Sequence, residues 1–375
     1  MKIGVLGGGA MGAGIAQVAA QAGHAVVLVD IQEAQLIKAT DQIKSGLAKL
    51  VEKGKFTADQ SQQVIANIVT STQTHDFIGC GLVIEAIVEK LDIKQNVFQS
   101  LDALLDKEVI LASNTSSLSI TAIASVCQYP ERVVGLHFFN PATIMPLVEI
   151  IPATQTDEKI PVVLKDLMTA WKKVPVLAKD WPGFIVNRVA RPYYSEALRI
   201  FDEGLASQPE IDAAMRMAGF KMGPFELMDL IGHDVNYAVT ESVFSAFYFD
   251  PRFKPSITQK KLVEAKWLGK KTGRGFYSYP QGCPAVELAA EKATFIQERI
   301  LCMLINEACD AHYLGLASEE DIDLAMTKGV NYPKGLFAWG NEWGFQQVHR
   351  SLQQLMEHYH EDRYRASSGL IQRAQ

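Results

Sequence analysis

The chain has 375 residues and a formal net charge of −6, and 48% of its residues are hydrophobic while 21% are charged. This length provides for two or three domains with cores of their own, and the composition is typical of a globular protein in water rather than of a membrane protein or a general nucleic-acid binder. The five cysteines are scattered without paired spacing, which disfavours a disulfide framework or a metal site and predicts a reducing, cytoplasmic location.

The N-terminal segment has two readings. Residues 3–29 contain no Asp, Glu, Lys or Arg, as is typical of the apolar part of an export signal. Seven glycines, however, interrupt this segment and cluster as they do in a turn. We therefore predict a strand over residues 3–6, a helix over 10–22 and a second strand over 25–29 that ends at Asp30.

The glycines after the first predicted strand have the spacing of a dinucleotide-binding motif. Gly7, Gly9 and Gly12 form G-x-G-x-x-G between that strand and the helix. The first glycine permits a tight turn, the second lets a pyrophosphate approach the backbone, and the third lets the helix pack closely on the sheet. Asp30 can accept hydrogen bonds from both ribose hydroxyls and would repel a 2′-phosphate, so the motif predicts NAD as the cofactor.

Further apolar runs alternate with helical segments as far as residue 180. The predicted strands are 68–71, 82–87, 109–112, 135–139, 147–151 and 174–178. This alternation predicts a Rossmann-type, doubly wound parallel α/β domain over residues 1–180, with ligands at the carboxyl ends of the strands. Glu85 and Glu89 lie at one such end and "SNTSS" (113–117) at another, where small polar side chains either contact a ligand or cap the next helix.

The stretch "GLHFFNPATIMPLVEI" (135–150) places one histidine and one glutamate among apolar residues. If its two strands form a symmetric antiparallel hairpin, His137 and Glu149 are opposite each other, because their positions average to 143, the middle of the loop. A carboxylate beside an imidazole fixes its tautomer and stabilises its cation. A hydrogen-bonded core histidine is the alternative, but the predicted cofactor site favours a general base.

Beyond a predicted linker at residues 179–184, the chain is expected to be helical throughout. The segment 204–215, "GLASQPEIDAAM", recurs at 315–326 as "GLASEEDIDLAM", with eight of twelve positions identical at an offset of 111. Such self-similarity predicts a duplicated helical domain, with copies at 184–283 and 284–375. Asn187 of the first copy corresponds to Glu298 of the second, so the second copy is expected to be structural.

Seven motifs in order make the first 280 or so residues similar to the L-3-hydroxyacyl-CoA dehydrogenase family of fatty-acid β-oxidation. They are "GVLGGGAMGAGIA", "VIEAIVEKLDIKQNVF", "ILASNTSSLSIT", "GLHFFNPATIMPLVEI", "DWPGFIVNRV", "MGPFELMDLIG" and "GKKTGRGFY". The resemblance implies an NAD-dependent enzyme that reversibly oxidises a 3-hydroxyacyl-CoA to a 3-oxoacyl-CoA. The two-copy arrangement resembles the dehydrogenase part of multifunctional β-oxidation proteins.

The family's functional residues can be assigned to positions of this sequence where the motifs match. The resemblance implies that His137 is the catalytic base and Glu149 its partner. It also implies substrate contacts by Ser116 and Asn187 and a coenzyme A contact by Lys53. The implied cofactor contacts, beside the glycine turn, are Asp30, Glu89, Lys94, Ser116 and Lys271.

Two alternatives stay open. A β-hydroxyacid dehydrogenase shares the glycine turn but uses a lysine instead of a histidine–glutamate pair, and a non-catalytic, crystallin-like member keeps only the fold. The motifs do not define the acyl chain. Because single-copy relatives resemble dimers that pair through their helical domains, we expect either a monomer with an intramolecular pseudo-dimer or a homodimer.

Overall fold

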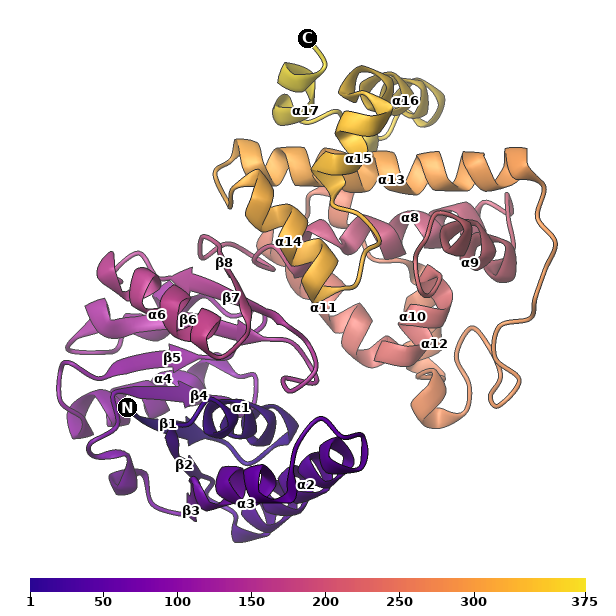
Figure 1. The fold of residues 1–375 in the computed structure, drawn as a ribbon. Helices are drawn as coiled ribbons and strands as arrows, with labels where there is room; N and C mark the ends of the chain where they lie inside the picture. Colours follow the sequence, from indigo (N-terminus) through magenta and orange to yellow (C-terminus); the bar gives the residue numbers. More distant parts are fainter. The chain divides into compact units, whose positions relative to one another are not determined.

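The computed structural model describes residues 1–375 and divides into two compact units, Met1–Trp181 and Pro182–Gln375. The first unit contains one eight-stranded sheet with helices between its strands (Figure 1). Its elements are β1 (Lys2–Leu6), α1 (Ala10–Gln21), β2 (Ala25–Val29), α2 (Glu33–Glu52), α3 (Ala58–Ala66), β3 (Ile68–Ser71), β4 (Leu82–Glu85), α4 (Leu91–Leu104), β5 (Ile110–Ser113), α5 (Ile120–Ala124), β6 (Val133–Phe138), β7 (Leu147–Pro152), α6 (Lys159–Ala170) and β8 (Val174–Leu177).

The strand order of the sheet is β3-β2-β1-β4-β5-β6-β7-β8. All neighbours pair in parallel except β6 and β7, which form the antiparallel hairpin predicted from the sequence. The chain reverses direction across the sheet after β3, so the carboxyl ends of β1 and β4 meet at a switch point where such folds bind ligands. The predicted Rossmann-type fold is therefore confirmed.

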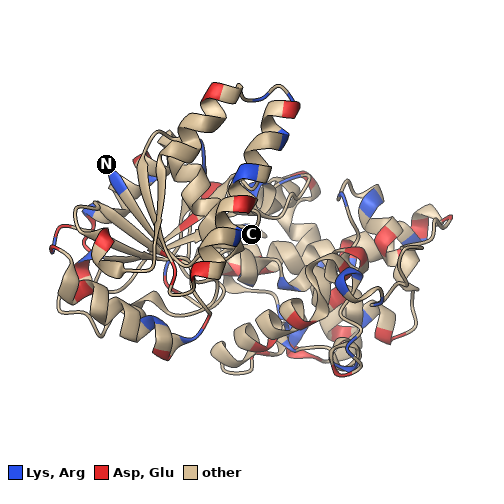
Figure 2. Ribbon diagram, turned by 90° about the horizontal axis from the view of Figure 1, so that it is seen from below, with Lys and Arg blue, Asp and Glu red and all other residues tan.

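The strands carry very few charged residues (Figure 2). Most strand residues are buried, because helices cover both faces of the sheet. Only Lys2, Glu85 and Glu149 are charged among the strand residues. Both glutamates are fully buried. A carboxylate buried in a sheet needs a partner, so these two positions single out the end of β4 and the middle of β7 as places of chemical interest.

The predicted strand 82–87 ends earlier than expected, at Glu85. The backbone N–H of Ile87 donates to Oε1 of Glu85 at 2.7 Å rather than to a neighbouring strand. The local side-chain hydrogen bond therefore competes with the sheet and turns the chain away from it. The apolar pattern gives no sign of this hydrogen bond, so the strand predicted from it is two residues too long.

The second unit is entirely helical, as predicted. Its helices are α7 (Val186–Val189), α8 (Arg191–Asp202), α9 (Gln208–Met217), α10 (Pro224–Ile231), α11 (His233–Ala246), α12 (Ile257–Glu264), α13 (Ala290–Tyr313), α14 (Glu319–Gly329), α15 (Leu336–Trp343), α16 (Phe345–Tyr359) and α17 (Ser368–Arg373). The long helix α13 packs against α8 and α9 on one side and against α15, α16 and α17 on the other (Figure 1). No helix of the chain has the length and apolar composition needed to cross a bilayer.

Candidate active site

The glycine turn between β1 and α1 has the shape that a dinucleotide requires. Gly7 adopts φ +109°, and a Cβ there would lie 2.6 Å from the carbonyl oxygen of Ala86. A Cβ on Gly12 would lie 1.8 Å from the carbonyl oxygen of Gly7, so the helix packs on the turn only because residue 12 has no side chain. A Cβ on Gly9 would meet nothing within 4 Å, so the backbone there is open to an approaching ligand.

The N-terminus of α1 is free of competing groups. Gly9 is its N-cap, no side chain caps the helix, and its first turn holds no acidic residue. The unpaired N–H groups and the positive end of the helix dipole favour a phosphate at this position. The residues of the turn therefore fit the pyrophosphate of NAD.

Asp30 lies at the end of β2 beside this turn. Its Oδ2 accepts from the N–H of Gly8 at 2.7 Å and its Oδ1 accepts from Gln32 N–H at 2.8 Å. A cavity of about 860 Å³ extends from Gly7, Gly9 and Asp30 over apolar side chains of the β4–α4 region. Ile31 and Val88, which line this cavity, are 83% and 58% exposed, so their apolar surfaces are accessible to a ligand there.

Glu89, Lys94 and Ser116 gather at the ends of β4 and β5. Oε1 of Glu89 accepts from the Thr115 hydroxyl at 2.6 Å and from the Ser116 N–H at 2.9 Å. The Lys94 ammonium lies 3.3 Å from Oε2 of Glu89 and 2.6 Å from Oε1 of Glu85. Burial alone would raise the pKa of Glu89, but the hydrogen bonds from Thr115 and Ser116 and the charge of Lys94 hold it below its usual value.

Glu85, which the sequence placed beside Glu89 at a strand end but without a role of its own, organises this group. Its Oε2 accepts from the Ser113 hydroxyl at 2.7 Å, while its other oxygen binds Lys94, which is only 1% exposed. The one available sign was a charged residue at the end of an apolar strand. The amine of Lys94 is thus bound to two carboxylates of the protein, and its implied contact with the cofactor stays a prediction.

His137 and Glu149 are direct cross-strand partners in the β6–β7 hairpin, as the symmetric register predicted. Nδ1 of His137 lies 2.7 Å from Oε2 of Glu149. Because a carboxylate only accepts, Nδ1 carries the proton and Nε2 is the ring nitrogen at which a further proton can bind. The histidine is 6% exposed and the glutamate fully buried, so the pair is shielded from bulk water.

Two further contacts fix the hairpin that carries this pair. Oδ1 of Asn114, which follows β5, accepts from the N–H of Phe138 at 2.8 Å. The buried ammonium of Lys173 donates to the carbonyl oxygens of Ala142 and Met145 in the hairpin loop, the latter at 2.8 Å. Burial lowers the pKa of Lys173 to about 8. Neither role was predicted, because both depend on contacts between segments that are distant in sequence.

Of the remaining predicted site residues, one belongs to the first unit and two belong to the second. Lys53 is exposed and is the C-cap of α2, directly after the last residue of that helix. Asn187 lies in α7 of the second unit. Lys271 also belongs to the second unit, where its ammonium binds Oδ1 of Asp234 at 2.6 Å.

The fold, the glycine turn, the acid after β2 and the shielded histidine–glutamate pair together define the class of the protein as a dinucleotide-dependent oxidoreductase. Residues 2–181 match the NAD-binding domain of 3-hydroxyacyl-CoA dehydrogenase. Residues 183–279 and 295–374 both match its C-terminal domain.

Similar proteins of known name agree with this class. A curated Escherichia coli protein, 3-hydroxyadipyl-CoA dehydrogenase, is 40% identical over 460 aligned positions that cover 99% of this chain and 97% of the relative. The mitochondrial hydroxyacyl-coenzyme A dehydrogenase of Rattus norvegicus is 46% identical over 283 residues, 73% of this chain and 90% of the relative.

A solved structure, 3-hydroxybutyryl-CoA dehydrogenase from E. coli, superimposes with a TM-score of 0.95 at 39% identity and covers 100% of this chain and 98% of that one. The chain therefore belongs to the 3-hydroxyacyl-CoA dehydrogenase family. Its activity is that of the family, the NAD-dependent oxidation of a 3-hydroxyacyl-CoA.

Proposed function

We propose that the protein oxidises L-3-hydroxyacyl-CoA reversibly to 3-oxoacyl-CoA with His137 as the general base. The observation that carries this proposal is the 2.7 Å contact between Nδ1 of His137 and the buried Glu149. Glu149 holds the imidazole in the tautomer that leaves Nε2 to take a proton from the 3-hydroxyl. The same carboxylate stabilises the imidazolium that results.

NAD, when bound, supplies the acceptor for the hydride that leaves carbon 3. The residues of the chain bind and orient: Gly7, Gly9 and Gly12 cradle the pyrophosphate and Asp30 binds the ribose hydroxyls. Contacts of Glu89, Lys94 and Lys271 with the cofactor belong to the same proposal and are supported by the family resemblance.

The substrate contacts are also part of the proposal. Ser116 lies in the cluster around Glu89 at the end of β5, where its hydroxyl can bind a substrate oxygen. Asn187 and Lys53 are assigned to the substrate oxygens and to coenzyme A by the matching motifs alone. Fixing the reacting carbon in this way is what lets a positioned base act efficiently.

An assay of the purified protein tests this function against both alternatives. We expect oxidation of NADH with acetoacetyl-CoA as substrate. Activity with free 3-hydroxy acids and none with coenzyme A esters would identify a β-hydroxyacid dehydrogenase instead. No activity with either substrate class would identify a non-catalytic member of the family. Because the two E. coli relatives are named for different acyl groups, 3-hydroxybutyryl-CoA and 3-hydroxyadipyl-CoA should be compared side by side.

We further propose that residues 284–375 are a structural second copy of the helical domain 184–283. Two buried ion pairs support the duplication, because the arginine and the glutamate of one pair are each offset by 111 residues from those of the other. Nε of Arg188 donates to Glu307 at 2.7 Å, and Nε of Arg299 donates to Glu196 at 2.5 Å. Exchange of equivalent contacts is the pattern of a two-fold dimer interface, here within one chain.

If the second copy replaces a dimer contact, its removal should expose that interface. Light scattering on a chain of residues 1–290 is expected to show a dimer or an aggregating protein. A well-folded monomer would contradict the pseudo-dimer proposal.

We also propose a cytoplasmic location, which is expected from the five free cysteines.

A further inference from the structure

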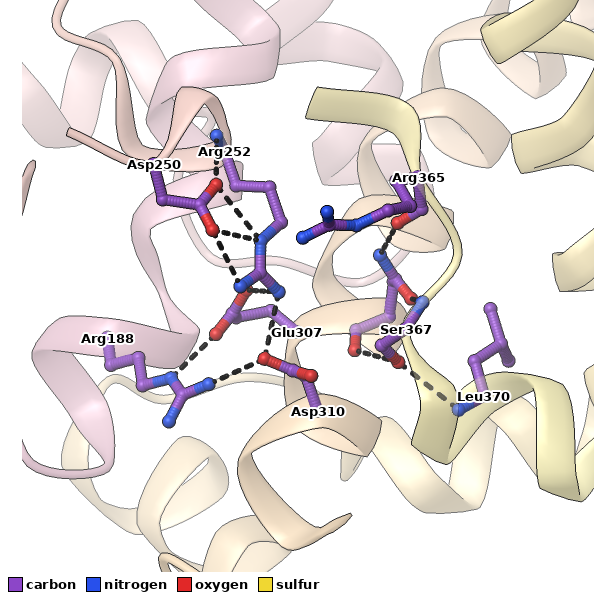
Figure 3. A network of polar contacts seen from close by, with 9 residues as sticks. Arg188, Asp250, Arg252, Glu307, Asp310, Arg365, Ser367 and Leu370 are labelled. Carbon is purple, nitrogen blue, oxygen red and sulfur yellow. Dashed lines mark hydrogen bonds and ion pairs between the residues drawn. The ribbon is translucent and has the colours of Figure 1, made fainter. Parts of the chain in front are cut away.

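The second unit contains a buried cluster of charged side chains next to a residue that is proposed to contact substrate. Arg188 is fully buried and follows Asn187 in α7. Its Nε donates to Oε1 of Glu307 at 2.7 Å, and its Nη2 donates to Oδ2 of Asp310 at 2.8 Å. Both acids lie on α13, within the predicted second copy, and Figure 3 shows the guanidinium directed at both carboxylates.

A second arginine holds the same two acids from the opposite direction. Nη1 of Arg252 donates to Oδ2 of Asp310 at 2.9 Å and to Oε2 of Glu307 at 3.2 Å (Figure 3). Asp250 binds Nη2 of Arg252 at 3.0 Å. Glu307 therefore shares its two oxygens between two arginines, which fixes the orientation of its carboxylate.

Helix α7 depends on such contacts for its position. It has only four residues, and a single helical turn is not stable by itself. It follows Gly183 and Phe184, which adopt φ +76° and +48°, so no regular element leads into it. It packs against α13 and α14 as well as α11. The place of Asn187 is thus set by tertiary contacts, and the ion pairs of Arg188 tie it to α13.

We propose that Glu307 and Asp310 are positioning residues for Asn187, because they hold Arg188 and through it the turn that carries the asparagine. The second copy thereby contributes to substrate binding, although its own counterpart of Asn187 is Glu298. This inference rests on the proposed contact of Asn187 with substrate. Misplacing a substrate-orienting group by about 1 Å can cost up to about 10²-fold in rate.

The chain provides a matched control for this cluster. Arg299 and Glu196 form the equivalent ion pair, and both are buried. The residue before Arg299 is Glu298, which has no proposed contact with substrate. Changing Glu196 therefore disturbs a buried arginine–glutamate pair of the same unit without removing a partner of Arg188.

Kinetics of Glu307→Gln and Glu196→Gln in the full-length protein test the inference. Both variants are expected to lower the thermal midpoint. Only Glu307→Gln should reduce kcat/KM for acetoacetyl-CoA, by at least about tenfold, with NADH affinity within about twofold of the original. In an Asn187→Ala background the same change should have no further kinetic effect, because it acts through the asparagine.

Equal kinetic losses in the two glutamate variants, no loss in Glu307→Gln, or an undiminished loss in the Asn187→Ala background would overturn the inference. Unchanged kinetics of Asn187→Ala itself would instead refute the proposed substrate contact. If Glu307→Gln does not fold, Arg188→Lys can be compared with Arg299→Lys. Lysine keeps the charge but loses the fork that reaches two acids, so a selective tenfold loss in Arg188→Lys is again the expected result.

Discussion

Replacement of His137 by alanine is expected to lower turnover at saturating acetoacetyl-CoA by at least about a hundredfold, the usual scale for loss of a general base. The affinity for NADH should change little, because the glycine turn connects β1 to α1 and Asp30 follows β2, whereas His137 belongs to the β6–β7 hairpin. Steady-state kinetics and a fluorescence titration with NADH measure the two quantities separately.

The variant His75→Ala is a suitable control for His137→Ala. His75 is exposed and lies outside the hairpin, so its replacement should leave both turnover and NADH affinity unchanged. A large loss of NADH binding in His137→Ala with near-normal turnover at saturation would show that the histidine has a structural or cofactor-binding role instead.

Gly12→Ala is expected to weaken NADH binding by at least about a hundredfold, a loss of about 2.7 kcal/mol. The added Cβ would lie 1.8 Å from the carbonyl oxygen of Gly7, so either the turn or the start of α1 must move. Either movement displaces the N–H groups that bind the pyrophosphate. A fluorescence titration with NADH measures the loss.

Gly46→Ala separates this effect from a general response to a larger side chain. Gly46 lies within α2, where its Cβ would meet only the end of the flexible Gln17 side chain at 3.3 Å. This variant should bind NADH normally and be slightly more stable, since alanine favours a helix interior. Normal NADH binding by a folded Gly12→Ala protein would contradict the assignment of the glycine turn.

The sequence was sufficient for those parts of the fold that depend on local patterns. The order of strands and helices followed from the alternation of apolar runs, and the pairing of His137 with Glu149 followed from the symmetry of one hairpin. The end of β4 was misplaced because the hydrogen bond from Ile87 to the side chain of Glu85 overrides the apolar pattern.

Contacts between distant segments could not be predicted in this way. Lys173 binds the hairpin loop 28 and 31 positions earlier, and Arg188 meets acids 119 and 122 positions later. Such pairs have no fixed spacing in a sequence, because they arise only after the elements have packed. The internal repeat indicated two helical copies. It did not indicate that acids of the second copy, Glu307 and Asp310, bind Arg188 of the first.

The central claim is that His137, oriented by Glu149, exchanges a proton with the oxygen on carbon 3 of the substrate. A crystal structure of the protein with NAD and acetoacetyl-CoA measures this directly. We expect Nε2 of His137 at hydrogen-bond distance from that oxygen, about 2.6–3.2 Å, with the contact between Nδ1 and Glu149 retained. A substrate oxygen beyond the reach of Nε2 and of any bridging water, or an imidazole turned away from it, would contradict the claim.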